Sequence, residues 1–311
     1  MRERAVAIFG LGLIGASVGL GLAGRLRRLG ADPDPEARRV AEATGAVEAA
    51  HEAPGPWLGE ASLVVLAAPP GALPALAAAV APWLAPDAVV TDVAGAKGRV
   101  AAALEPLLPA GRYVPGHPMA GSERTGARWA DPALFRGAVW FFCPPPAASA
   151  AGTPTAAWEA AYARAARLAE SLGARPLRLP AALHDRWVAR TSHLPYLVAA
   201  ALAAAAGVEE SQGIAQAVAG GFRDGTRVAA MNPEVGAGMC LANREELLAA
   251  LGAFRRALDA LEEALGEGRE ERLVGLLARA RAARAALLEA AEAATDGEPA
   301  PAGPSAGRDG D

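Results

Sequence analysis

The sequence contains few cysteines, few histidines and almost no lysine. Cys143 and Cys240 lie far apart and in no metal-ligand spacing, so neither a disulfide framework nor a cysteine metal site is expected. This cysteine usage is typical of a reducing compartment, and we predict a cytoplasmic protein. Four histidines leave little material for a metal site, so we expect no metal. Lys97 is the only lysine; selection for its compact ammonium and retention by chance both fit the sequence.

Long apolar runs and a strong net charge are also absent. No stretch of about 20 apolar residues is free of proline or charge, which argues against a membrane span. The apolar stretch up to Ala23 resembles a signal peptide, but its glycines are spaced for a turn and not for a continuous helix. The net charge of −4 is unpatterned, which argues against nucleic acid or an anionic membrane as a partner. An anionic small substrate stays compatible, since it needs only one or two arginines.

Short apolar runs alternate with alanine-rich helical segments in the first half of the chain. A length of 311 residues favours two domains. Strands alternating with helices indicate an α/β fold with a doubly wound parallel sheet, covered on both faces. We therefore predict a Rossmann-like dinucleotide-binding domain over residues 1–180. Its strands are predicted at residues 5–10, 29–31, 62–67, 88–91, 113–115 and 138–143.

The pattern changes after about residue 180 and becomes almost entirely helical. It predicts an all-α substrate and dimerisation domain over residues 181–294, because its apolar helices are too apolar to stand exposed. We expect a helical bundle shared in a homodimer. Residues 295–311, rich in proline, glycine and acidic residues, predict a disordered tail. Long helices are expected at residues 187–207, 213–230 and 245–265.

A glycine-rich turn at residues 10–15 follows the first predicted strand and opens a helix. Gly10 permits the tight turn, Gly12 lets the backbone approach a pyrophosphate, and Gly15 lets the helix pack against the strand. The helix N-terminus offers N–H groups and a partial positive charge to phosphates. This context predicts a dinucleotide site. Its cofactor contacts are expected from Gly10, Gly12, Leu13, Ile14 and Gly15.

Asp32 stands about 20 residues after the turn's start, at the end of the second predicted strand. A carboxylate there bonds a free ribose 2′-hydroxyl and repels a 2′-phosphate, which favours NAD over NADP. A simple turn residue in Asp-Pro-Asp-Pro is the alternative interpretation. Nearby arginines are the signal for NADP: Arg25, Arg27, Arg28, Arg38 and Arg39.

His117 lies in a segment, residues 116–123, that follows a predicted strand. We expect this segment to be a loop at the carboxyl edge of the sheet, where ligands of such sheets bind. A neutral histidine can take a proton from a substrate hydroxyl while hydride leaves for NAD⁺. A loop histidine that caps backbone groups is an equal alternative.

Six segments occur in the order and spacing of the prephenate/arogenate dehydrogenase family, which the chain resembles from about residue 5 to 265. The resemblance implies NAD-dependent oxidative decarboxylation of prephenate to 4-hydroxyphenylpyruvate in tyrosine biosynthesis. Arogenate, which would give tyrosine directly, is the alternative substrate. In this reaction hydride leaves the ring carbon that bears the hydroxyl, and the opposite carboxylate departs as CO₂. The segments are residues 10–15, 92–97, 117–126, 184–185, 192–195 and 221–227.

The same resemblance implies roles for four side chains. His117 is the catalytic group at the ring hydroxyl, and Arg227 grips a substrate carboxylate with its planar guanidinium. His193 belongs to the substrate pocket, and Glu123 is an ion-pair partner near Arg227. A surface charge at Arg227 and a core histidine at position 193 are the structural alternatives. We interpret residues 184–185, His-Asp, as a polar pair at a helix start.

Two positions depart from the family pattern. Gly95, expected beside the cofactor, stands where the family usually has a serine, so a hydroxyl that would bond substrate or nicotinamide is missing. We expect a water in its place and a higher kcat/KM for Gly95→Ser. Tyr196, expected in the substrate pocket, stands where the family often has a second histidine. Tyrosine donates a hydrogen bond but carries no positive charge near neutral pH, which leaves prephenate and arogenate both open.

Two other functions are weighed against this one. A β-hydroxyacid dehydrogenase would use a catalytic lysine in the helical domain, and the sequence has none there. A non-catalytic dinucleotide sensor is supported only by the missing serine. A turnover assay with both substrates separates a sensor from an enzyme.

Overall fold

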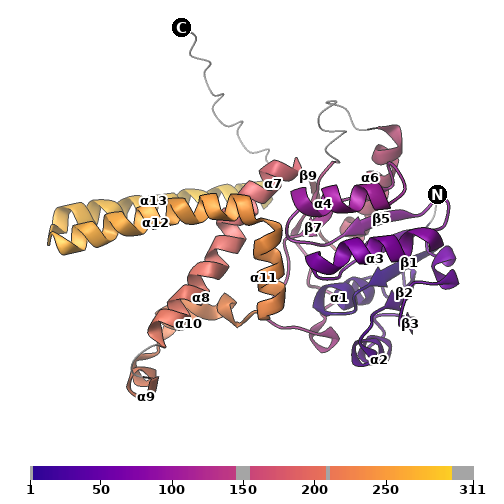
Figure 1. The fold of residues 1–311 in the computed structure, drawn as a ribbon, viewed down its shortest axis with the longest axis horizontal. Coiled ribbons are helices and arrows are strands. Elements are labelled where there is room, and N and C mark those ends of the chain that lie inside the picture. The colour runs from indigo at the N-terminus through magenta and orange to yellow at the C-terminus, as the bar shows by residue number, and fades with distance from the viewer. Residues whose placement is uncertain (1–2, 145–154, 208–210, 296–311) are drawn as a thin grey trace, which may run out of the picture. The chain divides into compact units, whose positions relative to one another are not determined.

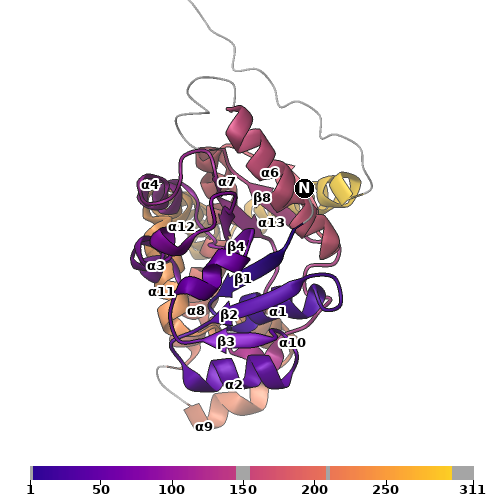
Figure 2. The ribbon, with the colours of Figure 1, turned by 90° about the vertical axis from the view of Figure 1, so that its right-hand side faces the viewer.

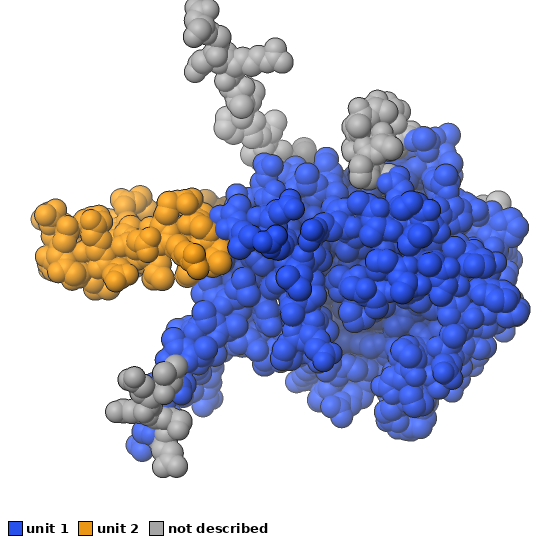
Figure 3. Space-filling view, in the orientation of Figure 1, with its two compact units in different colours: residues 1–250 blue, residues 251–311 orange. Residues whose placement is uncertain are grey.

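The computed structural model describes residues 3–144, 155–207 and 211–295, and it divides into two compact units, residues 1–250 and 251–311 (Figure 3). The disordered tail predicted from residue 295 onward lies outside the described residues, except for Thr295, which ends helix α13 (Glu270–Thr295). No helix in the described ranges is long and apolar enough to cross a membrane.

The first unit contains a six-stranded parallel sheet in the order β3-β2-β1-β4-β5-β6, of which Figure 2 shows β3, β2, β1 and β4 in sequence. This is the strand order of dinucleotide-binding folds, so the predicted Rossmann-like sheet is confirmed. Strand β3 was not predicted, because its alanine-rich segment has no β-branched residue. The strands are β1 (Ala5–Phe9), β2 (Arg27–Ala31), β3 (Ala49–His51), β4 (Leu63–Leu66), β5 (Val89–Asp92) and β6 (Tyr113–Val114).

Helices cover both faces of this sheet. Val6 and Ile8 of β1 belong to the core beneath α1, α2 and α6, whereas Ala7 and Phe9 belong to the core beneath α3 and α4. Every residue of β1 is buried, which explains why the strand is a continuous apolar run without polar alternation. The helices are α1 (Leu13–Gly21), α2 (Pro35–Ala43), α3 (Leu73–Val80), α4 (Gly98–Leu104) and α6 (Ala156–Ser171).

A second, three-stranded sheet is formed by β7 (Gly116–Pro118), β8 (Val139–Phe142) and β9 (Arg175–Arg178). The strand predicted at residues 138–143 corresponds to β8, so its expected place in the parallel sheet was wrong. The loop predicted for residues 116–123 is therefore wrong at its start, because His117 pairs with Phe141 in an antiparallel ladder. The segment gave no strand signal, since proline is tolerated only on an edge strand such as β7. The ladder, and not a free loop, fixes the backbone of His117.

From α7 onward the described chain is helical, as predicted (Figure 1). Two of the three long helices are interrupted. Residues 187–207 contain the π-helix Ala189–His193, and residues 213–230 are divided by the extended residues Val218 and Ala219. The third corresponds to α12. The helices are α7 (Ala181–Val188), α8 (Leu194–Ala206), α9 (Ser211–Ile214), α10 (Gly220–Thr226), α11 (Pro233–Ala242), α12 (Arg244–Gly266) and α13.

Candidate active site

The glycine-rich turn has a different steric reason for each of its three glycines. Gly10 has a φ of +91°, and a Cβ there would lie 2.5 Å from the carbonyl oxygen of Ala67. A Cβ on Gly15 would lie 1.9 Å from the carbonyl oxygen of Gly10, so helix and strand pack in contact. A Cβ on Gly12 would meet nothing within 4 Å, and Gly12 caps α1 without any side-chain bond. The open N-terminus of α1 is thus shaped to receive a phosphate.

The carboxylate of Asp32 lies across this turn from β2. Its Oδ2 accepts from the backbone N–H of Leu11 at 2.7 Å, and its Oδ1 accepts from the backbone N–H of Asp34 at 2.9 Å. These bonds hold the carboxylate at the strand end where a ribose hydroxyl binds in such folds. Arg38 donates to the backbone carbonyl of Asp32. The other four arginines near the site, Arg25, Arg27, Arg28 and Arg39, bond to Ser171, Glu60, Glu48 and Glu36.

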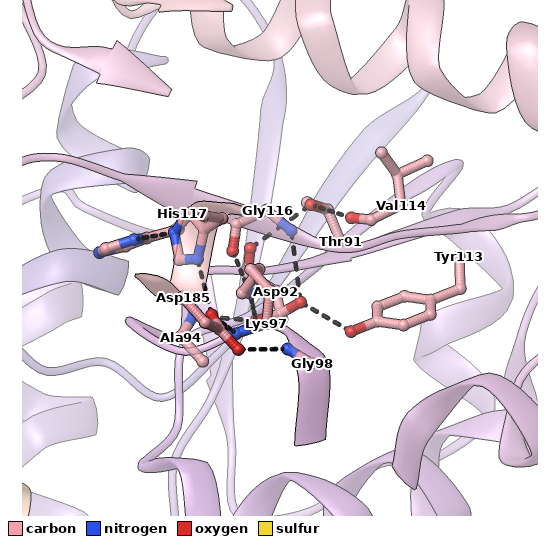
Figure 4. Close-up of polar contacts among 11 residues, drawn as sticks. Thr91, Asp92, Ala94, Lys97, Gly98, Tyr113, Val114, Gly116, His117 and Asp185 are labelled. Atoms are coloured by element: carbon pink, nitrogen blue, oxygen red, sulfur yellow. Dashed lines mark hydrogen bonds and ion pairs between the residues drawn. The ribbon is translucent and has the colours of Figure 1, made fainter. Parts of the chain in front are cut away.

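Lys97 is fully buried and does not present its charge to a ligand. Its Nζ donates to Asp92 at the end of β5 and to the carbonyl of Gly116 at the start of β7 (Figure 4). The Asp92 carboxylate also accepts from the hydroxyl of Tyr113 at 2.8 Å, and burial together with this carboxylate raises the pKa of Tyr113 well above its usual value. The only lysine therefore ties the two sheets together directly beside His117.

A chain of three side chains ends at His117. The Asp185 carboxylate accepts from the backbone N–H groups of Lys97 and Gly98 at 2.7 and 2.8 Å, at the start of α4. It also contacts His184 Nδ1 at 2.8 Å, and His184 Nε2 lies 2.8 Å from His117 Nδ1. His184 and Asp185 are buried, so this chain is shielded from water.

The ionisation of Asp185 determines the tautomers along this chain. Burial alone would raise its pKa, but the bonds from His184 and from the two backbone N–H groups lower it, so the group is a carboxylate that only accepts. His184 Nδ1 must then carry a proton, and His184 Nε2 accepts. The proton on His117 consequently lies on Nδ1, and its Nε2 keeps a free lone pair.

Burial keeps these histidines neutral. It lowers the pKa of His117 well below 6.5, and the nearby His184, Lys97 and His193 add to the shift. Burial also lowers the pKa of His184, although Asp185 opposes that change. His117 is thus neutral at neutral pH, and its Nε2 is a hydrogen-bond acceptor. Among the described residues, no group of three or more histidine, cysteine, aspartate or glutamate side chains is placed to hold a metal ion.

His193 and Gly95 complete the same cluster. His193 is 1% exposed, and burial lowers its pKa to about 4. Its Nδ1 lies 3.2 Å from the amide nitrogen of Asn243, which donates to the backbone carbonyl of Asp185 at 2.8 Å. A Cβ on Gly95 would lie 3.7 Å from Nε2 of both His117 and His193. The structure thus brings together Gly95, His117 and His193, which span almost 100 positions of the sequence.

The remaining candidates lie outside this hydrogen-bonded cluster. Arg227 Nη1 donates to Glu123 Oε2 at 2.9 Å, so the expected ion pair exists, and its side chains are 61% and 29% exposed. The hydroxyl of Tyr196 packs against Gly236 of α11, where a Cβ would be only 2.2 Å away. Gly121, four residues after His117, would bring a Cβ within 3.9 Å of Ile14 in α1, so the segment after β7 lies beside the glycine-rich turn.

Sequence reasoning missed the contribution of His184, Asp185 and Asn243. The His-Asp pair was interpreted as a helix start, yet it lies within α7 and contacts His117 and the start of α4. Asn243 gave no motif. The rarity of asparagine in the sequence was a usable signal, since Asn232 is the only other one.

Comparison with known proteins agrees with this geometry. The family model "Prephenate dehydrogenase, nucleotide-binding domain" matches residues 23–165, and "Prephenate dehydrogenase, dimerization domain" matches residues 180–279. A cyclohexadienyl dehydrogenase of Zymomonas mobilis is 34% identical over 231 residues, which cover 73% of this chain and 76% of that protein.

Two solved structures are similar over nearly the whole chain. Prephenate dehydrogenase of Aquifex aeolicus, in complex with hydroxyphenyl propionate and NAD⁺, has a TM-score of 0.83 at 26% identity and covers 92% of this chain and 99% of its own. Synechocystis arogenate dehydrogenase has a TM-score of 0.70 at 29% identity and covers 91% and 99%. Together with the two family models, these similarities establish that the chain belongs to the prephenate dehydrogenase family.

Proposed function

We propose that the protein is an NAD-dependent dehydrogenase that oxidatively decarboxylates prephenate to 4-hydroxyphenylpyruvate in tyrosine biosynthesis. The observation that carries the proposal is the chain from Asp185 through His184 to His117, which leaves His117 Nε2 as a neutral acceptor. This acceptor stands on a strand whose following segment touches α1 at the glycine-rich turn. The family membership and the NAD⁺ complex of the A. aeolicus relative support the cofactor and the substrate class.

The residues that would hold the cofactor fit it sterically. Gly12 leaves the space above the N-terminus of α1 open, so the backbone of Leu13 and Ile14 can donate to the pyrophosphate. Asp32 is held by two backbone bonds at the position that meets a ribose 2′-hydroxyl. Gly95 adds no side chain beside His117, where the nicotinamide would end. Bound NAD⁺ would supply the hydride acceptor.

His117 acts on the ring hydroxyl of the substrate. Its Nε2 accepts the hydroxyl proton as the ring carbon loses hydride, which stabilises the positive charge that would otherwise develop on that carbon and oxygen. The electron pair of the bond to the departing carboxylate enters the ring, CO₂ leaves, and the ring becomes aromatic. His117 then returns the proton to the phenol oxygen. Asp185, acting through His184, stabilises the protonated His117 as a carboxylate does in a Ser-His-Asp triad.

Arg227 is proposed to bind the carboxylate of the substrate's side chain. Its guanidinium is largely exposed and, within the described part of the chain, bonds only to Glu123, which a substrate carboxylate can replace in bidentate form. A pyruvyl and an alanyl side chain both carry this carboxylate. The similarity to an arogenate dehydrogenase therefore keeps arogenate as the second candidate substrate.

One assay tests the function directly. Purified protein is mixed with prephenate or arogenate and with NAD⁺ or NADP⁺, and NADH or NADPH formation is followed by absorbance. We expect turnover with prephenate and NAD⁺. His117→Asn should lower kcat by ~10²–10⁴ while the Kd for NAD⁺ is unchanged. Absence of turnover with either substrate, with intact NAD⁺ binding, would favour a sensor, and an active His117→Asn variant would disprove the role of His117.

We also propose the division of labour along the chain. Residues 1–180 hold the cofactor, and residues 181–294 supply substrate contacts and associate with a second copy. The match to a dimerization domain supports the homodimer, as do leucines of the second unit such as Leu265 and Leu287, which are 65% and 68% exposed. Light scattering on the purified protein should give twice the mass of one chain, and Leu287→Glu should lower the measured mass. Both cysteines are free thiols, which fits the predicted cytoplasmic location.

A further inference from the structure

The segment that follows β7 runs along helix α1 and is fixed to it at two points. A Cβ on Gly121 would lie 3.9 Å from Ile14, which stands in the first turn of α1. Further on, the backbone N–H of Asp131 donates at 2.9 Å to the buried hydroxyl of Ser17, in the second turn. The residues between these points are therefore held beside the end of α1 that the glycine-rich turn leaves open for a phosphate.

Two arginines of this segment flank a tryptophan. Trp129 ends the short helix η5 (Ala127–Trp129), whose Ala127 is buried in the core beneath α1 and α2. The guanidinium carbon of Arg124 lies 4.2 Å from the centre of the Trp129 ring, and that of Arg128 lies 5.7 Å from it. The negative face of an indole attracts a cation within about 6 Å, so the ring holds Arg124 closely and Arg128 only at the limit of this range.

The stack occupies the flat face of Arg124 and leaves its edge free. The N–H groups of a guanidinium lie in its plane and point outward, so a ring on the face blocks none of them. Within the described ranges, the Arg124 guanidinium has no carboxylate at ion-pair distance and donates no hydrogen bond. The adjacent carboxylate, Glu123, is bonded to Arg227. Arg124 is thus an oriented cation whose donors are available to an anion.

Helix α1 brings no cation of its own to a dinucleotide. A pyrophosphate is doubly negative, whereas a helix N-terminus supplies only about half a positive charge. No residue of α1 is charged, and the only lysine, Lys97, is buried against Asp92. The arginines around β2 and α2 already donate to protein oxygens: Arg25, Arg27, Arg28, Arg38 and Arg39.

We propose that Arg124, held on the ring of Trp129, binds the pyrophosphate of the dinucleotide. The inference rests on the cofactor part of the proposed function. A phosphate is favoured over the substrate carboxylate because the segment is fixed to α1 on both sides of Arg124, at Gly121 and at Asp131. Trp129 is a positioning residue, since stacking removes side-chain freedom that Arg124 would otherwise lose on binding.

Calorimetry with parts of the cofactor tests which group Arg124 recognises. The titrants are NAD⁺, ADP-ribose, 2′-AMP and adenosine, the last measured by competition with ADP-ribose. Arg124→Gln should weaken NAD⁺ and ADP-ribose by about ten-fold, the effect of one charge-assisted hydrogen bond, and leave adenosine unchanged. A purely structural role would weaken adenosine as well, and a loss confined to 2′-AMP would assign Arg124 to the ribose end. Either result would overturn the inference.

Three variants test how Arg124 is held. Trp129→Leu should weaken ADP-ribose by about two- to five-fold, and adding it to Arg124→Gln should cause no further loss, because Trp129 acts through Arg124. If Trp129→Leu fails to fold, Arg124→Lys replaces it: the charge stays but the planar donors go, so ADP-ribose should bind more weakly than to wild type. The matched control, Arg128→Gln, removes the same charge from the same segment and should change Kd by less than about two-fold. Equal losses in Arg124→Gln and Arg128→Gln would contradict a specific contact.

The outcomes separate this inference from the proposed function. If wild type turns over prephenate and Arg124→Gln keeps the wild-type Kd of NAD⁺ and ADP-ribose, the inference is wrong and the function stands. A higher KM for prephenate in Arg124→Gln, with both Kd values unchanged, would assign Arg124 to the substrate and refute the pyrophosphate contact. If wild type binds NAD⁺ but turns over neither substrate, the function fails and the titrations still decide the role of Arg124. If wild type binds neither NAD⁺ nor ADP-ribose, both fail.

Discussion

Replacement of His184 separates the role of a tautomer from the role of packing. His184→Met retains an unbranched apolar side chain in the buried site but removes both ring nitrogens, so His117 Nδ1 loses its acceptor at 2.8 Å. His184→Gln also removes the ring but offers a carbonyl oxygen that can accept from His117 Nδ1–H. Both variants disrupt the imidazole packing against Phe141. They differ in whether His117 keeps its proton on Nδ1.

The size of the expected effect follows from the cost of an unpaired donor. A buried N–H without a partner costs about 1–3 kcal/mol. In His184→Met that cost falls on the reactive tautomer of His117 alone, since the other tautomer places its proton on Nε2. The reactive fraction should therefore fall by about 5- to 150-fold, with 1.4 kcal/mol for each factor of ten. In His184→Gln the acceptor persists, and kcat should fall by less than about five-fold.

Single-turnover formation of NADH measures this difference in the chemical step, and the Kd of NAD⁺ and the thermal midpoint serve as controls for folding. The methionine variant should lose kcat with little change in KM, because the tautomer matters when the proton moves and not when substrate binds. Equal rates for the methionine and glutamine variants, with both folded, would show that His184 does not act through the tautomer of His117. A higher kcat in the glutamine variant than in the methionine variant is a result that a purely structural role of His184 would not produce.

Three further predictions concern stability, cofactor choice and substrate affinity. Burial lowers the pKa of His193 from 6.5 to about 4, so the unfolded chain binds a proton that the folded chain does not, and stability is lost as pH falls from 6.5 toward 4. Urea unfolding should show about 2 kcal/mol less stability from this group at about pH 5 than at about pH 7, and His193→Gln should remove that part of the slope. Asp32→Ser should weaken the binding of NAD⁺. It should also raise the ratio of kcat/KM with NADP⁺ to kcat/KM with NAD⁺ by about ten-fold or more, because Arg38 already lies beside the ribose position. An unchanged ratio would exclude Asp32 from the cofactor site. Arg227→Gln should raise KM for prephenate by about ten-fold with a smaller change in kcat, whereas Glu123→Gln should lower KM. A lower KM in Arg227→Gln, or a higher KM in Glu123→Gln, would contradict the proposed carboxylate contact.

Signals that are local in the sequence predicted the cofactor half of the molecule. The glycine-rich turn at residues 10–15 combines a strand end, a positive φ and a helix start within six residues, and each has a residue-level cause. Continuous apolar runs predicted β1, β4 and β5, because strands buried on both faces need no polar alternation. Strand β7 was missed because its residues carry no strand propensity and it forms only by pairing with β8.

The hydrogen-bonded cluster could not be predicted in the same way. Its members come from the end of β5, from β7, from α7 and from the residue between α11 and α12, and no spacing rule connects them. Asp185 was visible as a polar residue, but its three donors lie almost 90 positions away or in the adjacent ring of His184. Such contacts depend on tertiary packing, which propensity and periodicity do not encode.

The π-helix Ala189–His193 explains why a helical pattern misplaces His193. His184 and His193 are nine residues apart, about two and a half turns of α-helix, which would set them on opposite faces. A π-turn takes up one extra residue, so the effective spacing is about eight residues, or roughly 80° around the axis. The two rings can then both serve the cluster, and Asn243 indeed bonds Asp185 and His193 with a single nitrogen. Pro195 follows this turn by two residues and has no backbone N–H for a carbonyl of the preceding turn, which gives the π-turn a local cause in the sequence.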